Sequence, residues 1–410
     1  MSGAFDVGED KITSIKSYII KIPVEIRLSS DEVKETSHLI TEIHTSSGII
    51  GIGEGTPYAI RGKSHSNIYN AYMLCRKVAK ELKGKKLDEA KDMLPRVQER
   101  FMEKSFFDYA PFLALETALL DAISKLSGVR FSKIIGGNFR DKVPVCGTVF
   151  LGEPKRMAET ARRWVLKGVK HLKIKVMGKK EIDTVNMKYI RDAVGFDPLI
   201  RIDANGAYKT VNNAINAINN LEKYDIAIVE QPLSWHDLDG LRRLRKKIYP
   251  KIMVDESLTV PSDIKRIAEK GAADIINFHP SKLGCLSVTR KAIEETVNLG
   301  LEFMIGSAVM TGIGVAAHLQ LAASIKKLHY PNEEVGLYEM FGIDVVSNPL
   351  KVTNGYIKIP EGYGVGVKVE RRKLERYSAG MDLFMAPILH AAYCFYQKFP
   401  SSIKRIVRKV

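Results

Sequence analysis

Three acidic residues follow short β-like runs at nearly equal intervals. Asp203 ends the run L-I-R-I-D, Glu230 ends I-A-I-V-E and Asp255 ends K-I-M-V-D, at intervals of 27 and 25 residues. Each acid alone fits the cap of the helix that follows its strand. Three carboxylates brought to one place would repel one another unless a cation lay between them. Hard oxygen ligands of this kind predict Mg²⁺, with Mn²⁺ as the alternative.

Two lysines, Lys173 and Lys175, stand two residues apart in the run L-K-I-K-V. At that spacing both side chains point to the same side of a strand, and a barrel strand leaves no open edge. Two ammonium groups held close together near a divalent cation lower each other's pKa, so a neutral lysine becomes available as a general base. The pair therefore indicates proton transfer, with two surface lysines on a strand edge as the simpler alternative.

His279 follows a fifth β-like run, D-I-I-N-F, and comes 24 residues after Asp255. Pro280 restricts His279 to an extended conformation, which places it at the end of the strand rather than in a helix. In a ring of strands it lies opposite the strand that carries the two lysines. His279 is therefore either a second proton-transfer group or a packing residue, and both interpretations stay open.

A repeated strand–helix unit must position these residues. The intervals fit one strand, one helix and two loops. Gly271 and Gly300 precede two of the strands, as helix stop signals would. The sequence predicts a modified TIM barrel, (β/α)7β, in which strand ends meet at one mouth; a doubly wound sheet is the rival. Strands are expected near residues 143–149, 172–176, 199–203, 226–230, 252–255, 274–278 and 302–306.

The first part of the chain has a different pattern. Strands are expected at 12–26 and on both sides of a hairpin turn at Ser46-Ser47-Gly48, and polar loops at 27–36 and 56–64. Three helices follow, at about 65–83, 87–104 and 109–127. We therefore predict an α/β protein with an α+β capping domain. The expected domains are the cap at 1–135, the barrel at 136–345, a return to the cap at 346–377 and a helical basic extension at 378–410.

Seven short motifs occur in order between residues 12 and 370. They are G-I-G-E-G-T-P at 51–57, K-I-K at 173–175, D-A-N-G at 203–206, E-Q-P at 230–232, D-E-S at 255–257, G-I-G-V-A-A-H-L at 312–319 and G-Y-G-V-G-V-K-V at 362–369. As an ordered set they resemble the enolase superfamily, and within it the muconate-lactonizing-enzyme-like subgroup of the mandelate racemase/muconate lactonizing enzyme family. Superfamily sites combine a Lys or His base with Mg²⁺ that stabilises an ene-diolate.

The resemblance implies roles for particular residues. Asp203, Glu230 and Asp255 would bind Mg²⁺, Lys175 would be the acid/base, and Lys173 would be its partner. Residues that would support these ligands or contact the substrate are Asn205, Gln231, Glu256, Lys282 and Arg61.

Two positions differ from the subgroup. Its usual second catalytic lysine, after the sixth barrel strand, matches His279, and Lys282 follows one helical turn later. Its usual acid after the seventh strand matches Met310. These differences weigh against the cycloisomerase and dipeptide epimerase sites in their usual form, and the His–Asp pair of the mandelate racemase branch is not reproduced either.

The expected activity is that of a metal-dependent isomerase, a racemase, epimerase or cycloisomerase. It would remove a proton α to a carboxylate, while the cation and Lys173 stabilise the enediolate that forms. Lys175 would serve one face of the substrate and His279 the other. An acid-sugar dehydratase is the alternative reaction, and a barrel that binds a ligand without turnover is the alternative outside catalysis.

Composition narrows the class of partner. The 410-residue chain carries a formal net charge of +16, but its Lys and Arg residues are spread along the sequence. This weighs against a nucleic-acid partner and favours a small anionic substrate. The four cysteines have no C-x-x-C spacing, which is typical of reduced core thiols, and the first residues lack the pattern of a secretion signal, so a cytoplasmic protein is expected.

The extension at 378–410 lies beyond the resemblance. Its apolar stretch is interrupted by Asp382 and Pro387, is shorter than the ~20 residues of a membrane span and is followed by a basic run. We expect a helix packed on the cap or on a second subunit, in line with a homo-oligomer. Contact with an anionic membrane surface is possible but less favoured.

Overall fold

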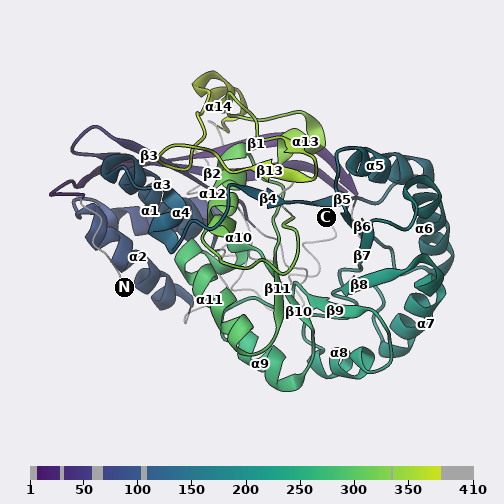
Figure 1. The fold of residues 1–410 in the computed structure, drawn as a ribbon. Coiled ribbons are helices and arrows are strands. Elements are labelled where there is room, and N and C mark those ends of the chain that lie inside the picture. The colour runs from purple at the N-terminus through teal and green to yellow at the C-terminus, as the bar shows by residue number, and fades with distance from the viewer. Residues whose placement is uncertain (1–6, 28–31, 58–67, 103–108, 334–335, 380–410) are drawn as a thin grey trace, which may run out of the picture.

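The computed structural model describes residues 7–27, 32–57, 68–102, 109–333 and 336–379. An antiparallel sheet with its helices lies against a ring of parallel strands that helices surround (Figure 1). Arg61 and nearly all of the 378–410 extension lie outside the described residues, so the expectations for them stay untested. In the described ranges, none of the helices combines the length and the apolar character needed to cross a membrane.

The N-terminal sheet contains β1 (Ile12–Arg27), β2 (Glu32–Thr45) and β3 (Ile50–Gly55). The hairpin between β2 and β3 is confirmed, and Gly48 takes a φ of +84° in its turn. The prediction of a polar loop at 27–36 is wrong for Arg27 and for residues 32–36, which are strand. The ladder reaches the pair Arg27–Glu32 because pairing between β1 and β2 satisfies backbone groups whatever the side chains are.

The three predicted cap helices are confirmed as α1 (Ile68–Leu82), α2 (Leu87–Met102) and α3 (Ala110–Ser127). Helices α1 and α3 pack on the sheet, and α2 packs on α3. Helix α3 is buried on every side from Ala110 to Ser124, because the sheet covers one face and the barrel helices cover another.

Strand β3 approaches α3 unusually closely. A Cβ on Gly51, Gly53 or Gly55 would come within 2.1 Å of a carbonyl oxygen of α3. Glycines two apart on a strand advance by about 6.6 Å and residues four apart on a helix by about 6.0 Å, so the two rows stay in step. The strand therefore rests directly on the helix backbone. The facing carbonyls belong to Ala118, Ala114 and Ala110.

Seven parallel strands form the second sheet, and their spatial order follows the chain. The first predicted strand divides into β4 (Lys142–Pro144) and β5; the other six are confirmed to within one residue at each end. The strands are β5 (Cys146–Val149), β6 (His171–Lys175), β7 (Leu199–Asp203), β8 (Ile226–Glu230), β9 (Lys251–Val254), β10 (Ile275–Phe278) and β11 (Glu302–Ile305). The helices are α4 (Phe131–Ile135), α5 (Pro154–Leu166), α6 (Lys180–Val194), α7 (Val211–Leu221) with the short η1 (Glu222–Tyr224), α8 (Leu238–Arg245), α9 (Asp263–Lys270), α10 (Pro280–Leu283), α11 (Leu286–Asn298) and α12 (Gly312–Ala323).

An eighth position closes the ring. Asn332 pairs in parallel with Val145, next to β5, and the backbone N–H of Glu333 donates to Ile305 of β11 at 2.9 Å. This segment joins the two edge strands, so the sheet is a closed barrel. The TIM-type fold is confirmed, and the doubly wound alternative is wrong.

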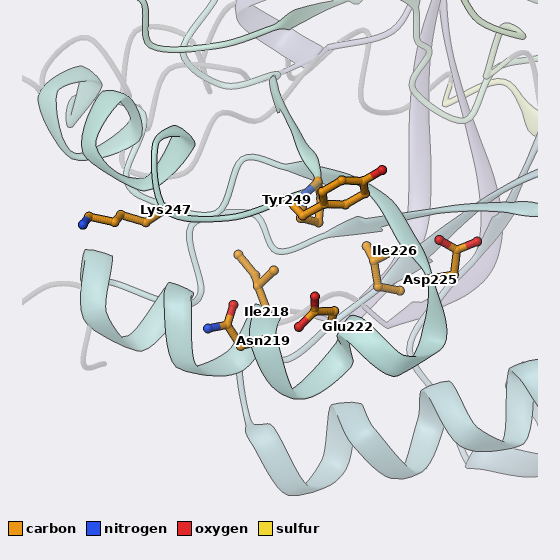
Figure 2. Close-up of a pocket in the computed structure, with 8 residues that line it drawn as sticks. Ile218, Asn219, Glu222, Asp225, Ile226, Lys247 and Tyr249 are labelled. Atoms are coloured by element: carbon orange, nitrogen blue, oxygen red, sulfur yellow. The ribbon is translucent and has the colours of Figure 1, made fainter.

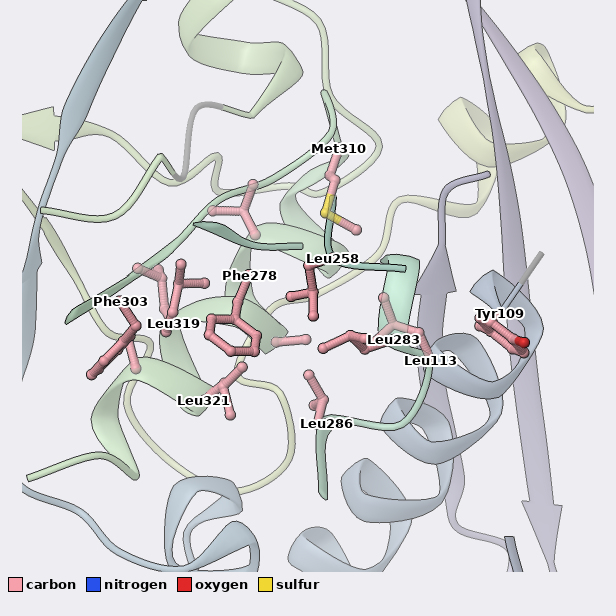
Figure 3. Packing of buried hydrophobic residues seen from close by; sticks show 14 of the residues in the cluster. Tyr109, Leu113, Leu258, Phe278, Leu283, Leu286, Phe303, Met310, Leu319 and Leu321 are labelled. Atoms are coloured by element: carbon pink, nitrogen blue, oxygen red, sulfur yellow. The ribbon is translucent and has the colours of Figure 1, made fainter. Parts of the chain in front are cut away.

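The hydrophobic core continues from the barrel into the cap. Leu283 and Leu286, which follow β10, lie between the barrel residue Phe278 and Leu113 of α3 (Figure 3). Three cysteines, Cys75, Cys146 and Cys285, are buried free thiols, as predicted; Cys75 and Cys285 lie in this core, and Cys146 lies in a second, smaller cluster among residues of the barrel strands. Cys394 lies outside the described residues.

The chain after the barrel forms α13 (Leu337–Phe341), β12 (Val352–Thr353), β13 (Tyr356–Lys358) and α14 (Arg371–Tyr377). Within the segment expected to return to the cap, the runs at 357–360 and 364–369 have a strand-like pattern, which predicts that they rejoin the first sheet. Strand β13 does form, but it pairs with β4 and β12. Residues 364 and 365 are not strand; the N–H groups of Gly364 and Val365 instead donate to Ser124 and Asp121 of α3.

Candidate active site at the barrel mouth

Lysines and carboxylates gather at the carboxyl ends of β6, β7 and β8. The parallel register places Lys175 beside Asp203, and Asp203 beside Glu230. Lys173, two residues earlier on β6, also points into the barrel. All four side chains are buried. The structure thus brings together residues that are up to 57 positions apart in the chain, as the spacing of the strands predicts.

Lys173 sits among three carboxylates. Its Nζ lies 2.8 Å from Asp203 Oδ2, 3.3 Å from Glu230 Oε1 and 3.1 Å from Glu333 Oε2. Burial lowers the pKa of Lys173, but the three carboxylates outweigh burial and hold that pKa well above its ordinary value. The prediction that the two lysines lower each other's pKa applies to a site that holds a divalent cation, and it stays a prediction. Among the carboxylates alone, the surrounding anions act on Lys173 more strongly than the neighbouring ammonium group does.

Lys175 contacts the same carboxylate from the other side. Its Nζ donates to Asp203 Oδ2 at 2.6 Å and to Asn205 Oδ1 at 2.8 Å. Burial raises the pKa of Asp203, but the two ammonium groups prevail and hold this pKa below its usual range. Asp203 is therefore an anion shared by both lysines.

Two charged residues of this cluster were missed by sequence reasoning. Arg201 is fully buried in the barrel, 3.2 Å from Glu230 Oε2 and 2.8 Å from Glu333 Oε2. Glu333 follows the eighth strand position and also accepts from Thr148 at 3.2 Å. The alternation of R-I-D on β7 was a usable signal for Arg201, because side chains two apart share a face. Glu333 had no such signal, since its segment lacks a strand pattern.

On the far side of the ring, two residues meet Asp255. Lys282 Nζ donates to the backbone oxygen of Asp255 at 2.6 Å and also contacts its Oδ1. His279 Nε2 lies 3.4 Å from the same Oδ1. Burial lowers the pKa of His279 to about 3, although Asp255 opposes this, so the imidazole is neutral. Strand β10, which His279 follows, lies opposite β6 in the ring, as predicted.

Gly306, just after β11, leaves room for the histidine. A Cβ at this position would lie 2.4 Å from Asn277 Oδ1 and 2.6 Å from His279 Nε2. Asn277 in turn donates to Glu230 Oε1 at 2.9 Å. The observed side-chain positions of Asn277 and His279 therefore require a glycine at the end of the next strand. Met310, where relatives of this type were expected to have an acid, is fully buried in the hydrophobic core.

The residues predicted to support the ligands form the rim of the cluster. Asn205 and Gln231 take left-handed φ values of 44° and 38°, which cost energy for non-glycine residues and are concentrated at functional sites. Asn205 Nδ2 donates to Glu256 Oε1 at 2.8 Å. Gln231 Oε1 accepts from the backbone N–H of Asp255 at 3.1 Å. Burial, with Asp255 and Asp203 nearby, raises the pKa of Glu256 to about 8.

The donor set fits a hard divalent cation. Three buried carboxylates come from adjacent strand ends, and oxygen ligands are those that Mg²⁺ and Mn²⁺ prefer. Within the described part of the chain, buried Glu256 Oε2 and Asn277 Oδ1 have no hydrogen-bond donor. Ammonium groups now separate the carboxylates, so in the described ranges no three acidic, His or Cys side chains already form a metal-holding group.

A cavity of about 390 Å³ lies elsewhere in the barrel (Figure 2). It opens between the end of α7 and the amino ends of β8 and β9. Parallel strands place their amino and carboxyl ends on opposite faces of a barrel, so this cavity is remote from the lysine–carboxylate cluster. Its lining residues are Ile218, Asn219, Glu222, Asp225, Ile226, Lys247, Tyr249 and Pro250.

Two family descriptions match the chain. Residues 13–136 match the mandelate racemase/muconate lactonizing enzyme N-terminal domain, and residues 156–373 match the enolase C-terminal domain-like family. The chain therefore belongs to the mandelate racemase/muconate lactonizing enzyme family and is an enzyme of the enolase superfamily, as its motifs indicate.

The relatives are enzymes of related kinds. The hydrophobic dipeptide epimerase of Enterococcus faecalis is 30% identical over 320 residues, covering 78% of this chain and 88% of the relative. The N-succinyl-L-Arg/Lys racemase of Bacillus cereus is 26% identical over 380 residues, covering 91% and 99%.

Solved structures share the fold of this chain. The Enterococcus faecalis dipeptide epimerase, complexed with Mg and L-Leu-L-Tyr, has a TM-score of 0.77 at 28% identity, covering 88% of this chain and all of that one. The muconate lactonizing enzyme of Pseudomonas fluorescens has a TM-score of 0.82 at 23% identity, covering 90% and 100%.

Proposed function

We propose that this enzyme is a metal-dependent isomerase that removes and returns a proton α to the carboxylate of a small substrate, through an enediolate. The proposal rests on one observation: Lys173 and Lys175 converge with buried carboxylates from neighbouring strand ends. A weak carbon acid reacts when a base reaches its proton and fixed positive charge stabilises the anion that forms.

Asp203, Glu230 and Asp255 are the residues that would hold Mg²⁺, with Mn²⁺ as the alternative. Bound there, the ion would supply positive charge to the substrate carboxylate. The ammonium groups of Lys173 and Lys282 now lie against these carboxylates, so cation binding must displace them.

Lys175 is the proposed acid/base on one face of the substrate. Its Nζ lies 2.6 Å from Asp203 Oδ2, so a cation bound to that carboxylate would compete with this contact and leave the Lys175 side chain free to approach the substrate. Lys173 also lies 3.1 Å from Glu333 Oε2, and this carboxylate, which is not a proposed metal ligand, would keep the Lys173 ammonium group charged. Its proposed task is to hold the substrate carboxylate as negative charge builds there.

His279 is the proposed group for the opposite face, with Lys282 beside it on Asp255. Racemisation or epimerisation needs a group on each face, and the ring order places β10 across from β6. This arrangement favours a racemase or epimerase over a reaction that uses one face only.

The test is exchange of the α-proton with solvent in heavy water. Dipeptides and N-succinyl amino acids come first in the substrate panel, because relatives named for such substrates match most of this chain. We expect Mg²⁺-dependent deuterium incorporation without net loss of water, and mass spectrometry measures both. Loss of water from a sugar acid would assign the dehydratase reaction instead. Binding without exchange for every ligand in the panel would indicate a barrel without turnover.

The stereochemical arm uses His279→Asn and both stereoisomers of an active substrate. If His279 serves the second face, the variant binds both but exchanges only one. Undiminished exchange of both would assign His279 to packing.

A further inference from the structure

Helix α6 carries an apolar stripe on its outer surface. Ile182, Val185 and Tyr189 are 39%, 47% and 39% exposed, and Phe196, two residues beyond the Gly195 that ends the helix, is 59% exposed. Positions i, i+3 and i+7 lie along one line of a helix, so the three helical side chains form a continuous row. Large apolar side chains gathered in this way typically mark a contact surface.

The stripe is separate from the face that packs on the barrel. Met187 and Ile190 are fully buried on that inner face. Helix α6 lies on the outer rim of the barrel, away from the cap (Figure 1). The stripe is therefore not a part of the core that is incompletely covered.

Charges of both signs flank the stripe in an ordered way. Lys179 and Glu181 are exposed at the start of α6, and Lys188 and Asp192 are exposed near its end, where they form an ion pair at 2.5 Å. Glu181, Lys188 and Asp192 fall on the same side of the stripe at 100° per residue.

We propose that a second copy of this chain binds the stripe across a two-fold axis near Val185, with the two α6 helices antiparallel. The same flank of each helix then meets itself in reverse direction. Lys188 comes opposite the partner's Glu181, and by symmetry Glu181 comes opposite the partner's Lys188. Ile182 comes opposite the partner's Tyr189, so apolar side chains meet along the whole row.

This charge order favours a copy of the same chain over other partners. A polyanion or an anionic membrane surface would meet Glu181 and Asp192 beside Lys188, whereas an antiparallel copy places Lys188 and Glu181 opposite each other twice across the axis. A stable contact buries ~800 Å² on each partner, more than one stripe supplies. The interface must therefore extend over α5, which packs along α6 and ends at the 74% exposed Leu166.

The first experiment compares Val185→Glu with Val297→Glu in the full chain. Val297 is a matched control, since it is 43% exposed on α11, on another side of the barrel. We expect the parent to be a dimer by light scattering and sedimentation, and its dissociation constant to rise by about 100-fold in Val185→Glu only. A monomeric parent, or equal effects of the two variants, would overturn the proposal. A monomeric parent whose melting temperature falls in Val185→Glu alone would mean that another segment of the same chain covers the stripe.

The second experiment stays informative if Val185→Glu folds poorly. Lys188→Glu places like charges opposite the partner's Glu181 and should weaken the dimer. Adding Glu181→Lys restores opposite charges across the axis and should restore association, although the Lys188–Asp192 pair stays broken in both variants. Failure of the double variant to recover would refute the antiparallel arrangement.

Discussion

Two regions of this enzyme bury carboxylates, and they satisfy them differently. At the junction of cap and barrel, Glu54 is 1% exposed and ends its side chain among fixed donors. Its Oε1 accepts from the N–H of Thr311 at 3.0 Å and from His38 at 2.9 Å, and its Oε2 accepts from the N–H of Gly314 at 2.8 Å. Two of these donors are backbone groups at the start of α12.

At the barrel mouth, flexible side chains contact the buried carboxylates. Glu230 and Asp255 meet the ends of Lys173, Lys282 and Arg201. Glu256 keeps one buried oxygen without a hydrogen-bond donor among the described residues.

The difference separates a structural carboxylate from a reactive one. The backbone N–H groups that bind Glu54 cannot move away, so their hydrogen bonds stabilise the junction between the cap and the barrel. Ammonium groups on four-carbon stems can move aside for a cation or a substrate. A fully satisfied polar cluster makes a structure rigid, whereas a partly satisfied one retains capacity for new partners.

The largest effect is expected from Lys175→Ala. Removal of a positioned acid/base costs 10²–10⁴-fold in general, so exchange of the substrate α-proton should fall by about 1,000-fold. Thermal stability should change little. The exposed Lys170→Ala, at the residue just before the same strand, is the control and should keep full activity. If Lys175→Ala retained parental exchange, the proposed base would be wrong.

The next largest effect is expected on stability, from removal of the Glu54 carboxylate at the junction of cap and barrel. Glu54→Ala leaves buried N–H groups of Thr311 and Gly314 without an acceptor, which should lower the free energy of unfolding by about 3 kcal/mol. Urea denaturation measures this. The exposed Glu25→Ala on β1 should change it by less than about 0.5 kcal/mol. Equal midpoints for the two variants would remove the distinction drawn between the regions.

Metal affinity should fall when a proposed ligand is neutralised. Asp203→Asn, Glu230→Gln and Asp255→Asn should each weaken Mg²⁺ binding by about 100-fold, or ~2.7 kcal/mol, in titration calorimetry. Chelation of a Mg²⁺-loaded sample should lower its melting temperature, since a ligand bound only to the folded state stabilises it. Unchanged affinity in all three variants would contradict the proposed site.

The smallest effect is expected from Glu256→Gln, and it tests directly whether the two regions differ in how they satisfy buried carboxylates. Glu256→Gln removes a buried carboxylate that is incompletely hydrogen-bonded, so the free energy of unfolding should change by less than about 1 kcal/mol. Glu54→Gln, the matched change at the junction, should cost distinctly more, because an amide NH₂ then faces N–H donors. Parity between these two variants would show that hydrogen-bond satisfaction does not separate the regions.

Much of this architecture was predictable from the sequence because it is periodic. Strand ends at Asp203 and Glu230 followed from apolar runs with a charged terminus, and alternation placed Lys173 and Lys175 on one face. The hairpin at Gly48 followed from turn chemistry. Local patterns of this kind predict local structure, and the βα repeat then brings the carboxyl ends of the strands to one face of the barrel.

What could not be predicted depends on distant partners. Glu333 contacts Lys173 across 160 residues, from a short segment that pairs with the two edge strands without forming a strand of its own. Residues 32–36 look like a loop, yet β1 pairs with them. The raised pKa of Lys173 likewise comes from three carboxylates on other elements, which no spacing within K-I-K could reveal.

The contact of β3 with the backbone of α3 also limits how the enzyme can open. Helix α3 is tied to the barrel in turn, since Glu116 accepts from the N–H of Ser287 at 3.1 Å. A rigid-body movement of the cap away from the barrel would therefore have to break the contacts of α3 with the barrel. Amide hydrogens of β3, α3 and α11 should then exchange with solvent together, in one cooperative opening, and substrate entry should rely on smaller local movements at the mouth.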